Sequence, residues 1–217
     1  MTTECLVKPY REVIPLPNGE AKLKLNLHPG QQQVWLSQAR FPVVLCGTQW
    51  GKTCLMPDWL HREITVKGEG DYLAGSATFP LLGLKMLPEF TTLFCDLLHW
   101  GDYKEDRLGN RVIQSSRGIA AGTVKVIDKS RIIFFSATNP ESIESATARG
   151  AVLDEPGQKQ FRQMTWEAVQ RRLALSEGRC LLGTTLYYFG GWLKNDVYDR
   201  ALKGDKEFQL FHGDSKD

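Results

Sequence analysis

Residues 43–56 constrain the fold of this 217-residue chain strongly, because an apolar run, a glycine-containing loop and a helical run follow one another directly. The run FPVVLC, which begins at Phe41, is short and lacks polar alternation, so it predicts a strand buried on both faces. The run from Lys52 has helical character, and Pro57 is expected to kink it or to fall in a short first segment. A strand, a loop and a helix in this order favour a phosphate-binding site.

The loop carries the groups that such a site requires. Its residues are Gly47, Thr48, Gln49, Trp50, Gly51, Lys52 and Thr53. Glycines let backbone N–H groups turn inward, a lysine reaches the β- and γ-phosphates, and a hydroxyl binds Mg²⁺. The usual pattern has one more residue between its glycines, but the chemistry does not need that spacing. The alternative is a glycine turn that happens to precede Lys52, and the flanking strand and helix argue against it.

A second cluster lies far downstream, where the run AVLDEP ends in Asp154 and Glu155. At the end of a strand, these residues would place one carboxylate beside Mg²⁺ and the other where it activates water. A carboxylate acting as general base commonly contributes about 10²–10⁴-fold to a rate. A strand ending in Asp-Glu is by itself more often a solvated strand end. Together with the loop, it predicts a nucleotide hydrolase with a catalytic glutamate and Mg²⁺ as cofactor.

Two further groups are weaker candidates. Gln31 and Gln32 precede the loop strand, and a glutamine amide can both donate to and accept from the edge of adenine. An exposed helix start explains these glutamines equally well. Gly183, Thr184 and Thr185 end another apolar run, and their hydroxyls are candidates for sensing the γ-phosphate. A threonine-rich strand end is the simpler explanation when this group is taken alone.

Composition excludes several classes of protein. The net charge of +2 is nearly balanced, so nucleic-acid binding would have to rely on local patches. Five cysteines without a C-x-x-C pair and four scattered histidines argue against a disulfide scaffold or a zinc site. No apolar run approaches the ~18 residues of a membrane span, and no signal peptide is evident. A cytoplasmic protein without a membrane partner is therefore expected.

The order of elements predicts an α/β fold. Residues 1–20 are expected to form an extended arm, and residues 21–217 a single domain. Short apolar runs at 71–77, 131–137, 150–155 and 179–185 alternate with helical segments, the last of them at about 190–205. Such alternation favours a mainly parallel sheet flanked by helices, with ligands at the carboxyl ends of its strands. Residues 100–131 are expected to form irregular hairpins that carry a candidate DNA surface, although a solvated face is at least as good an explanation.

Three blocks together resemble the ATPase domain of the large terminase subunit of tailed bacteriophages. They are LHPGQQQVWLSQARFPVVLCGTQWGKT, PESIESATARGAVLDEPGQ and LLGTTLYYFGGWLKNDVYDRALKGD, and the match runs from Leu27 to the end. The resemblance implies a P-loop NTPase of the ASCE type that hydrolyses ATP with Mg²⁺. It also implies that this ATPase pumps double-stranded viral DNA into a procapsid in the cytoplasm of the host cell. It also implies a portal protein, a small terminase subunit and a homo-oligomeric ring as partners, with the isolated chain mainly a monomer.

Site roles follow from the same resemblance. Gln31 and Gln32 correspond to the adenine-reading motif, and residues 47–53 to the Walker A loop. Asp154 and Glu155 correspond to the Walker B pair, which assigns Thr53 and Asp154 to the metal and Lys52 and Glu155 to catalysis. Gly183, Thr184 and Thr185 correspond to the motif that couples hydrolysis to movement.

The chain departs from its relatives in three places. Many relatives carry an arginine early in the phosphate loop, where this chain has Thr48 and Gln49. Pro156 follows Glu155 where relatives often have alanine. Large terminases continue into a nuclease domain that this sequence does not contain, so no DNA cleavage is expected. Two alternatives stay open: a helicase-like or other DNA-translocating ATPase, and a nucleotide-binding module with little hydrolysis.

Arg149 is the candidate for a catalytic arginine supplied to a neighbouring subunit. It directly precedes the strand that ends in Asp154, so it should lie at the amino end of that strand, away from its own nucleotide. An arginine that acts on a neighbour's phosphates is worth roughly 10³–10⁵ in rate in other phosphate-loop enzymes. Arg171 and Arg172 are competitors for this role, and a surface salt bridge is the alternative for Arg149.

Overall fold

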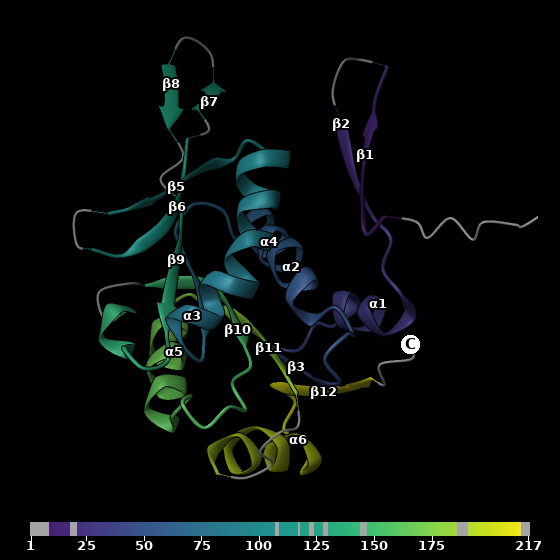
Figure 1. The fold of residues 1–217 in the computed structure, drawn as a ribbon, viewed down its shortest axis with the longest axis vertical. Coiled ribbons are helices and arrows are strands. Elements are labelled where there is room, and N and C mark those ends of the chain that lie inside the picture. Colours follow the sequence, from purple (N-terminus) through teal and green to yellow (C-terminus); the bar gives the residue numbers. More distant parts are fainter. Residues whose placement is uncertain are drawn as a thin grey trace, which may run out of the picture.

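The computed structural model describes residues 9–17, 21–106, 109–116, 118–121, 124–127, 130–143, 147–185 and 191–213. An eight-stranded sheet of order β12-β3-β11-β10-β4-β9-β6-β5 forms its centre (Figure 1). Six neighbouring strands are parallel: β12 (Phe208–Gly213), β3 (Phe41–Cys46), β11 (Arg179–Thr184), β10 (Ala148–Asp154), β4 (Asp71–Ser76) and β9 (Arg131–Ser136). β6 (Arg111–Ser115) runs antiparallel to β9 and to the edge strand β5 (Gly101–Glu105).

Helices cover both faces of this sheet. Alternate residues of β3 point to opposite sides: Val44 packs in the cluster that contains α2 (Lys52–Lys67), whereas Val43 packs in the cluster that contains α5 (Gln163–Ala174). All six residues of β3 are buried, which explains why its sequence is apolar without alternation. The predicted α/β fold with a mainly parallel sheet between helices is confirmed.

The remaining elements are short. On the α2 side of the sheet, a continuous helical stretch alternates between α and π geometry: α3 (Phe79–Leu81), η1 (Leu82–Met86), α4 (Leu87–Thr91) and η2 (Thr92–Leu97). The other helical segments are α1 (Pro29–Leu36), η3 (Pro140–Ile143), η4 (Leu193–Tyr198) and α6 (Asp199–Leu202). Two antiparallel hairpins stand apart from the sheet: β1 (Arg11–Pro15) with β2 (Ala21–Leu25), and β7 (Gly118–Ala121) with β8 (Val124–Ile127) (Figure 1).

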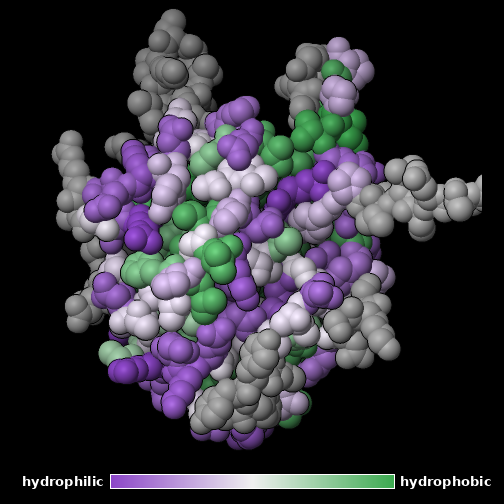
Figure 2. Space-filling view, in the orientation of Figure 1, coloured by the Kyte–Doolittle hydropathy of each residue, from purple (hydrophilic) through white to green (hydrophobic). Residues whose placement is uncertain are grey.

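The first hairpin corrects the predicted extended arm. Residues 11–15 form β1 and pair with β2, so the boundary expected at residue 20 falls inside a hairpin. Arg11 ties this hairpin to the domain, because its guanidinium donates to both carboxylate oxygens of the buried Asp58 in α2, the shortest of these hydrogen bonds being 2.8 Å. Most of the face drawn in Figure 2 is hydrophilic, and hydrophobic residues gather near the foot of this hairpin.

Three further expectations are modified. α2 runs unbroken past Pro57, so no short first segment forms. The helical spacing in the sequence extends from Gln31 to Arg40, but α1 ends at Leu36. β12 was not predicted, because only Phe208 and Phe211 of this edge strand are buried and its apolar run is broken by polar residues.

The predicted basic surface is described only in part. Arg107, Arg117, Lys129 and the side chain of Lys125 lie outside the described residues. The guanidinium of Arg131 donates to both carboxylate oxygens of Asp71, at 2.8 and 2.7 Å, and lies 3.6 Å from Asp106. Arg111 stacks over the ring of Phe79 at 4.8 Å. The charge of Arg131 is therefore offset by carboxylates, and a DNA surface in this segment stays a prediction.

Candidate nucleotide-binding site

The phosphate loop joins β3 to α2 at the edge of the sheet where the parallel strands end, here called the carboxyl edge. Gly51 caps the N-terminus of α2 with a positive φ of 85°, a conformation that glycine adopts without strain. The ammonium of Lys52 donates to the carbonyl oxygens of Cys46 and Gly47, at 3.3 and 2.9 Å, and to Oγ1 of Thr185 at 3.2 Å. A buried lysine is thus held at the mouth of a helix N-terminus, which is the arrangement that binds phosphate.

Thr53 and Asp154 meet beside this lysine. Oγ1 of Thr53 donates to Oδ1 of Asp154 at 3.3 Å, and Asp154 is 1% exposed. Burial and the neighbouring negative charge of Glu155 raise the pKa of Asp154 to about 6. The positive charges of Lys52 and Lys85 oppose this rise of the pKa. Hydroxyl and carboxylate oxygens are the ligands that Mg²⁺ prefers, so this pair fits the predicted metal.

Glu155 is held by the end of β11. Its Oε2 accepts from the N–H of Thr185 at 2.8 Å and from Oγ1 of Thr184 at 3.2 Å, and its Oε1 accepts from Oγ1 of Thr185 at 2.8 Å. Oε1 also lies 3.8 Å from the ammonium of Lys52. Gly183 allows close packing against Lys52 and Met56, since an added Cβ would lie 2.7 Å from the methyl group of Met56. The structure thus brings the loop, the acidic pair and the predicted coupling residues into one cluster.

The backbone of Glu155 is strained. Its φ of 54° lies in the left-handed region, which costs a non-glycine residue about 1–3 kcal/mol. The hydrogen bond from its N–H to the carbonyl of Gly183, at 2.8 Å, holds this conformation at the point where β10 ends. Strain of this kind often marks a functional site, and here it turns the carboxylate of Glu155 toward Lys52 and Thr185.

The two candidate glutamines are placed differently. Gln31 is 3% exposed, and its amide donates to the carbonyl of Gly51 at 3.4 Å, so it touches the phosphate loop. Gln32 is exposed, and its amide donates to the carbonyl of Leu27 at 2.8 Å. The structure therefore brings Gln31 to the site, whereas Gln32 caps the preceding turn.

Within the loop, Thr48 and Gln49 are exposed and Trp50 is buried. The indole of Trp50 packs edge-on against His28, with ring centroids 4.6 Å apart, so only its backbone is available to a nucleotide. Nε2 of His28 lies 3.0 Å from the carbonyl oxygen of Trp50, and Nδ1 accepts from the N–H of Gln31. His28 was missed as a site residue, although its place just before Pro29 is a helix N-cap position.

Ser76 is a second residue that sequence reasoning missed. It lies opposite Asp154 in the register of β4 and β10, and its buried hydroxyl has no hydrogen-bond partner among the described residues. A serine at the end of an apolar run carries no specific signal, so only the strand order could reveal this neighbour.

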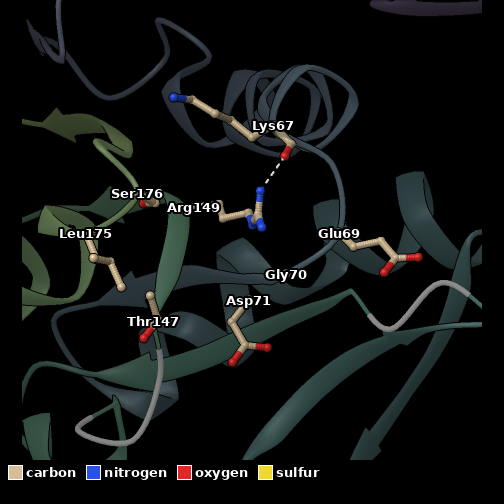
Figure 3. A pocket seen from close by; sticks show the side chains of 8 residues that line it. All are labelled: Lys67, Glu69, Gly70, Asp71, Thr147, Arg149, Leu175 and Ser176. Carbon is tan, nitrogen blue, oxygen red and sulfur yellow. Dashed lines mark hydrogen bonds between the residues drawn. The ribbon is translucent and has the colours of Figure 1, made fainter.

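Arg149 lies at the opposite edge of the sheet. It is the second residue of β10, and its Nη1 donates to the carbonyl of Lys67 at the end of α2, at 2.7 Å (Figure 3). It lines a hollow of about 580 Å³ that also contains Glu69, Asp71 and Ser176. Arg149 is therefore exposed and remote from the phosphate loop of its own chain, as its place in the sequence predicts. Arg171 and Arg172, in the last turn of α5, lie at the same edge.

In the part of the chain that the structure describes, no three His, Cys, Asp or Glu side chains group as metal ligands. In that same part, no helix is long and apolar enough to cross a bilayer.

Neither a protein-family model nor a curated protein sequence matches the chain. Solved structures do match. The large terminase ATPase domain of Thermus phage P74-26 is 18% identical with a TM-score of 0.64, covering 85% of this chain and 80% of that one. The large terminase of another thermophilic bacteriophage, in complex with ADP, is 14% identical with a TM-score of 0.66, covering 87% of this chain and 46% of that one. The large terminase of bacteriophage HK97 is 13% identical with a TM-score of 0.64, covering 91% of this chain and 40% of that one.

At these identities the similarity establishes the fold. The chain is an α/β protein with the P-loop NTPase fold. Within that class, its solved neighbours are large terminase ATPase domains from several phages, as the resemblance in the sequence predicted. The chain spans less than half the length of the ADP-bound terminase and of the HK97 protein.

Proposed function

We propose that this chain hydrolyses ATP and uses the energy to move double-stranded DNA into a viral procapsid, as the ATPase domain of a packaging motor. The observation that carries the proposal is the cluster at the carboxyl edge, where Lys52 lies 3.8 Å from Glu155 and Thr53 donates to Asp154. The shared fold with phage large terminases supports it. Two of the similar terminase structures are complexes with ADP and with ATP-gamma-S, which supports a nucleotide as ligand.

Each residue has a role in this proposal. The backbone of residues 47–53 and the ammonium of Lys52 bind the β- and γ-phosphates. Thr53 and Asp154 would hold Mg²⁺, which would offset phosphate charge when bound. Gln31 contacts the edge of the adenine base, and its hydrogen bond to the carbonyl of Gly51 connects it to the phosphate loop. Glu155 takes a proton from the attacking water.

Coupling to movement would begin at Glu155. Its carboxylate accepts three hydrogen bonds from Thr184 and Thr185, and a carboxylate can accept about four, so one position stays open to the attacking water. When the carboxylate takes up a proton from that water, its hydrogen bonds to the end of β11 weaken. A change at the carboxylate is thereby passed to residues that follow Thr185, and this is the motion that the coupling motif would transmit.

The larger assembly is also part of the proposal. Double-stranded DNA, a portal protein and a small terminase subunit are the partners, and the working form is a ring in the host cytoplasm. The isolated chain is expected to be mainly monomeric and a weak ATPase. The helicase-like alternative has no supporting observation in the site, and the intact contacts of Lys52 and Glu155 argue against an inactive binding module.

The test is phosphate release from ATP with and without duplex DNA. The parent chain should hydrolyse ATP, and Lys52→Ala should lower the rate by about 10²-fold or more, because the charge that meets the phosphates is lost. Lys203→Ala, which removes an exposed lysine directly after α6, is the matched control and should leave the rate unchanged. Hydrolysis by Lys52→Ala at a rate close to that of the parent would contradict the assignment of the phosphate loop.

A further inference from the structure

The turn that follows the acidic pair carries a lysine and an arginine between two hollows. Lys159 and Arg162 line a hollow of about 530 Å³ together with Thr138, Asn139 and Gln160. The same two cations line a second hollow of about 300 Å³ on the other side of the turn. Both side chains are exposed, and neither forms an ion pair with a described residue.

The charge of this surface is of one sign. Among the described residues that line either hollow, none is an aspartate or a glutamate, whereas the hollow around Arg149 also contains Glu69 and Asp71. Uncompensated cations beside threonine, asparagine and glutamine side chains are the set of groups that contacts phosphate oxygens in protein–DNA interfaces. The near-neutral net charge of the chain makes such a local patch necessary for any contact with DNA.

The turn is tied to the hydrolytic site by backbone hydrogen bonds. The N–H of Gln158 donates to the carbonyl of Glu155 at 3.1 Å, and the N–H of Phe161 donates to the carbonyl of Gln158 at 2.9 Å. The N–H of Gly157 donates to Oγ1 of Thr184 at 3.1 Å. A ligand that shifts this turn therefore acts on Glu155 and on the threonine that holds its carboxylate.

We propose that residues 158–162 contact the phosphate backbone of duplex DNA through Lys159 and Arg162. This inference rests on the proposed function and names the surface that the DNA substrate would touch. The same turn then links a bound phosphate to the catalytic carboxylate through a short stretch of backbone. Contacts to phosphate carry no sequence information, which suits a protein that moves along any duplex.

The experiment is the salt dependence of duplex binding, measured by fluorescence anisotropy on the full chain. Each phosphate contact contributes about 0.9 to the slope of log K against log salt. The double variant Lys159→Gln, Arg162→Gln should therefore lower the magnitude of the slope by about 1–2 and weaken binding equally for duplexes of different sequence. Lys203→Gln, Lys206→Gln removes the same charge at exposed places outside residues 100–131 and should leave the slope near that of the parent.

Any of three results would overturn the inference. One is an unchanged slope in the Lys159/Arg162 double variant, and another is the same fall in slope in the control double variant. Absence of duplex binding by the parent at low salt would overturn it as well. Phosphate release by the parent without DNA is measured in parallel, so failure of the proposed ATPase is seen separately. Thermal unfolding of each variant shows whether it is folded.

A different observation concerns Ser76. Residues of β4 alternate between the faces of the sheet, and Tyr72 and Ala74 pack in the cluster that contains α2, so Ser76 points to the same side. Val152 of β10 packs in this cluster too, which places the side chain of Asp154 there as well. Ser76 and Asp154 are neighbours in the parallel register, and Ser76 is fully buried with a hydroxyl that has no partner among the described residues.

We infer that the hydroxyl of Ser76 would bind a water molecule of the Mg²⁺ that Thr53 and Asp154 would hold. Mg²⁺ in nucleotide sites usually keeps several waters, and these need partners in the protein. Thr53 and Asp154 would supply oxygens for the metal, and Ser76 would supply a polar group from the neighbouring strand β4. A buried hydroxyl without a hydrogen-bond partner is unfavourable. A metal-bound water would supply that partner, and this would explain why a serine is kept at this position.

The test is the affinity for fluorescent ADP with Mg²⁺ and with EDTA. In Ser76→Ala, the gain in affinity that Mg²⁺ gives should fall by about three- to tenfold, the usual effect of one lost hydrogen bond, while affinity in EDTA stays that of the parent. Ser136→Ala is the control, because Ser136 lies on the next strand with its hydroxyl 2.7 Å from Oγ1 of Thr138. An unchanged gain in Ser76→Ala, or an equal loss of affinity with and without Mg²⁺, would overturn the inference.

Discussion

Glu155 combines three properties that rarely occur together in one side chain. It is buried, it has a positive φ, and its carboxylate accepts three hydrogen bonds from Thr184 and Thr185. A strand-end glutamate without a function would be expected to extend into solvent and to relax its backbone. The cost of this conformation is explained if the carboxylate must be held beside Lys52 until water is activated.

Glu155→Gln should therefore bind nucleotide within a few fold of the parent and hydrolyse it at least about 10²-fold more slowly, because an amide cannot take a proton from water. Nucleotide affinity and phosphate release measured on the same protein separate the two effects. Glu177→Gln is the matched control, since Glu177 is an exposed glutamate that also has a positive φ, of 49°. Normal turnover by Glu155→Gln would show that the base lies elsewhere.

Substitution of the two glutamines of the adenine motif should have different effects on nucleotide preference. Gln31→Ala should lower the preference for ATP over GTP by about tenfold, because the buried amide beside Gly51 is the group that can contact a base edge. Gln32→Ala should leave the preference unchanged, since Gln32 is exposed and bonded to Leu27. Competition of the two nucleotides for a fluorescent analogue measures both. Equal effects of the two substitutions would contradict the assignment.

Among single residues, the motif residues could be predicted from the sequence, whereas the side chains that surround them could not. Lys52, Thr53, Asp154 and Glu155 could be found because the chemistry fixes both the residue type and its place after a strand. The burial of Trp50 depends on its packing against His28, which lies on another element, so the loop sequence could not show it. The neighbours of a strand-end serine such as Ser76 depend on strand order, and strand order is not written in any local pattern.

Among the elements, the buried central strands could be predicted from the sequence, whereas the edge strand β12 and the hairpin strand β1 could not. β3, β4, β9, β10 and β11 are continuous apolar runs because both their faces are covered. β12 packs only part of its residues and lies at an edge, so its pattern is weak. β1 is stabilised by Arg11 and Asp58, which are 47 residues apart, and no local pattern reveals such a contact.

Arg11→Ala should destabilise the chain by about 3–5 kcal/mol, because it leaves the carboxylate of Asp58 buried without its partner. Urea unfolding measures the loss. Lys24→Ala is the control: it removes a pair with Glu12 that is partly exposed, and it should cost under about 1 kcal/mol. A loss in Arg11→Ala no larger than in the control would show that the hairpin is not held by this pair.

The same variant should respond to pH. Burial raises the pKa of Asp58, and the hydrogen bonds and charge of Arg11 oppose that rise, so removing Arg11 raises the pKa further. The folded state then binds the proton more tightly than the unfolded state does. Stability of Arg11→Ala should therefore increase as the pH falls through this raised pKa. Unfolding at several pH values should show the difference from the parent shrinking toward acid.

In the whole molecule, the predicted catalytic residues lie at opposite ends of the parallel strands. Lys52, Asp154 and Glu155 lie at the carboxyl edge, whereas Arg149 lies at the opposite edge, where the parallel strands begin. Arg149 cannot act on the nucleotide of its own chain from there, because the length of β10 separates them. Its hydrogen bond to the carbonyl of Lys67, at the end of α2, is of a kind that an exposed arginine can exchange. A second subunit would have to bring its carboxyl edge to this surface.

We therefore expect Arg149 to act between subunits of an assembled ring. Arg149→Ala should bind ATP with the affinity of the parent, yet lower hydrolysis by active neighbours when the two proteins are mixed with portal and DNA. The rate should fall more steeply than the fraction of parent subunits, because each variant subunit also silences a neighbour that is otherwise intact. Lys67→Ala, which removes another cation from the same hollow, is the control and should leave the rate of the mixture near that of the parent. A fall only in proportion to the fraction of Arg149→Ala would confine its effect to its own subunit, and an unchanged assembled rate would move the role to Arg171 or Arg172.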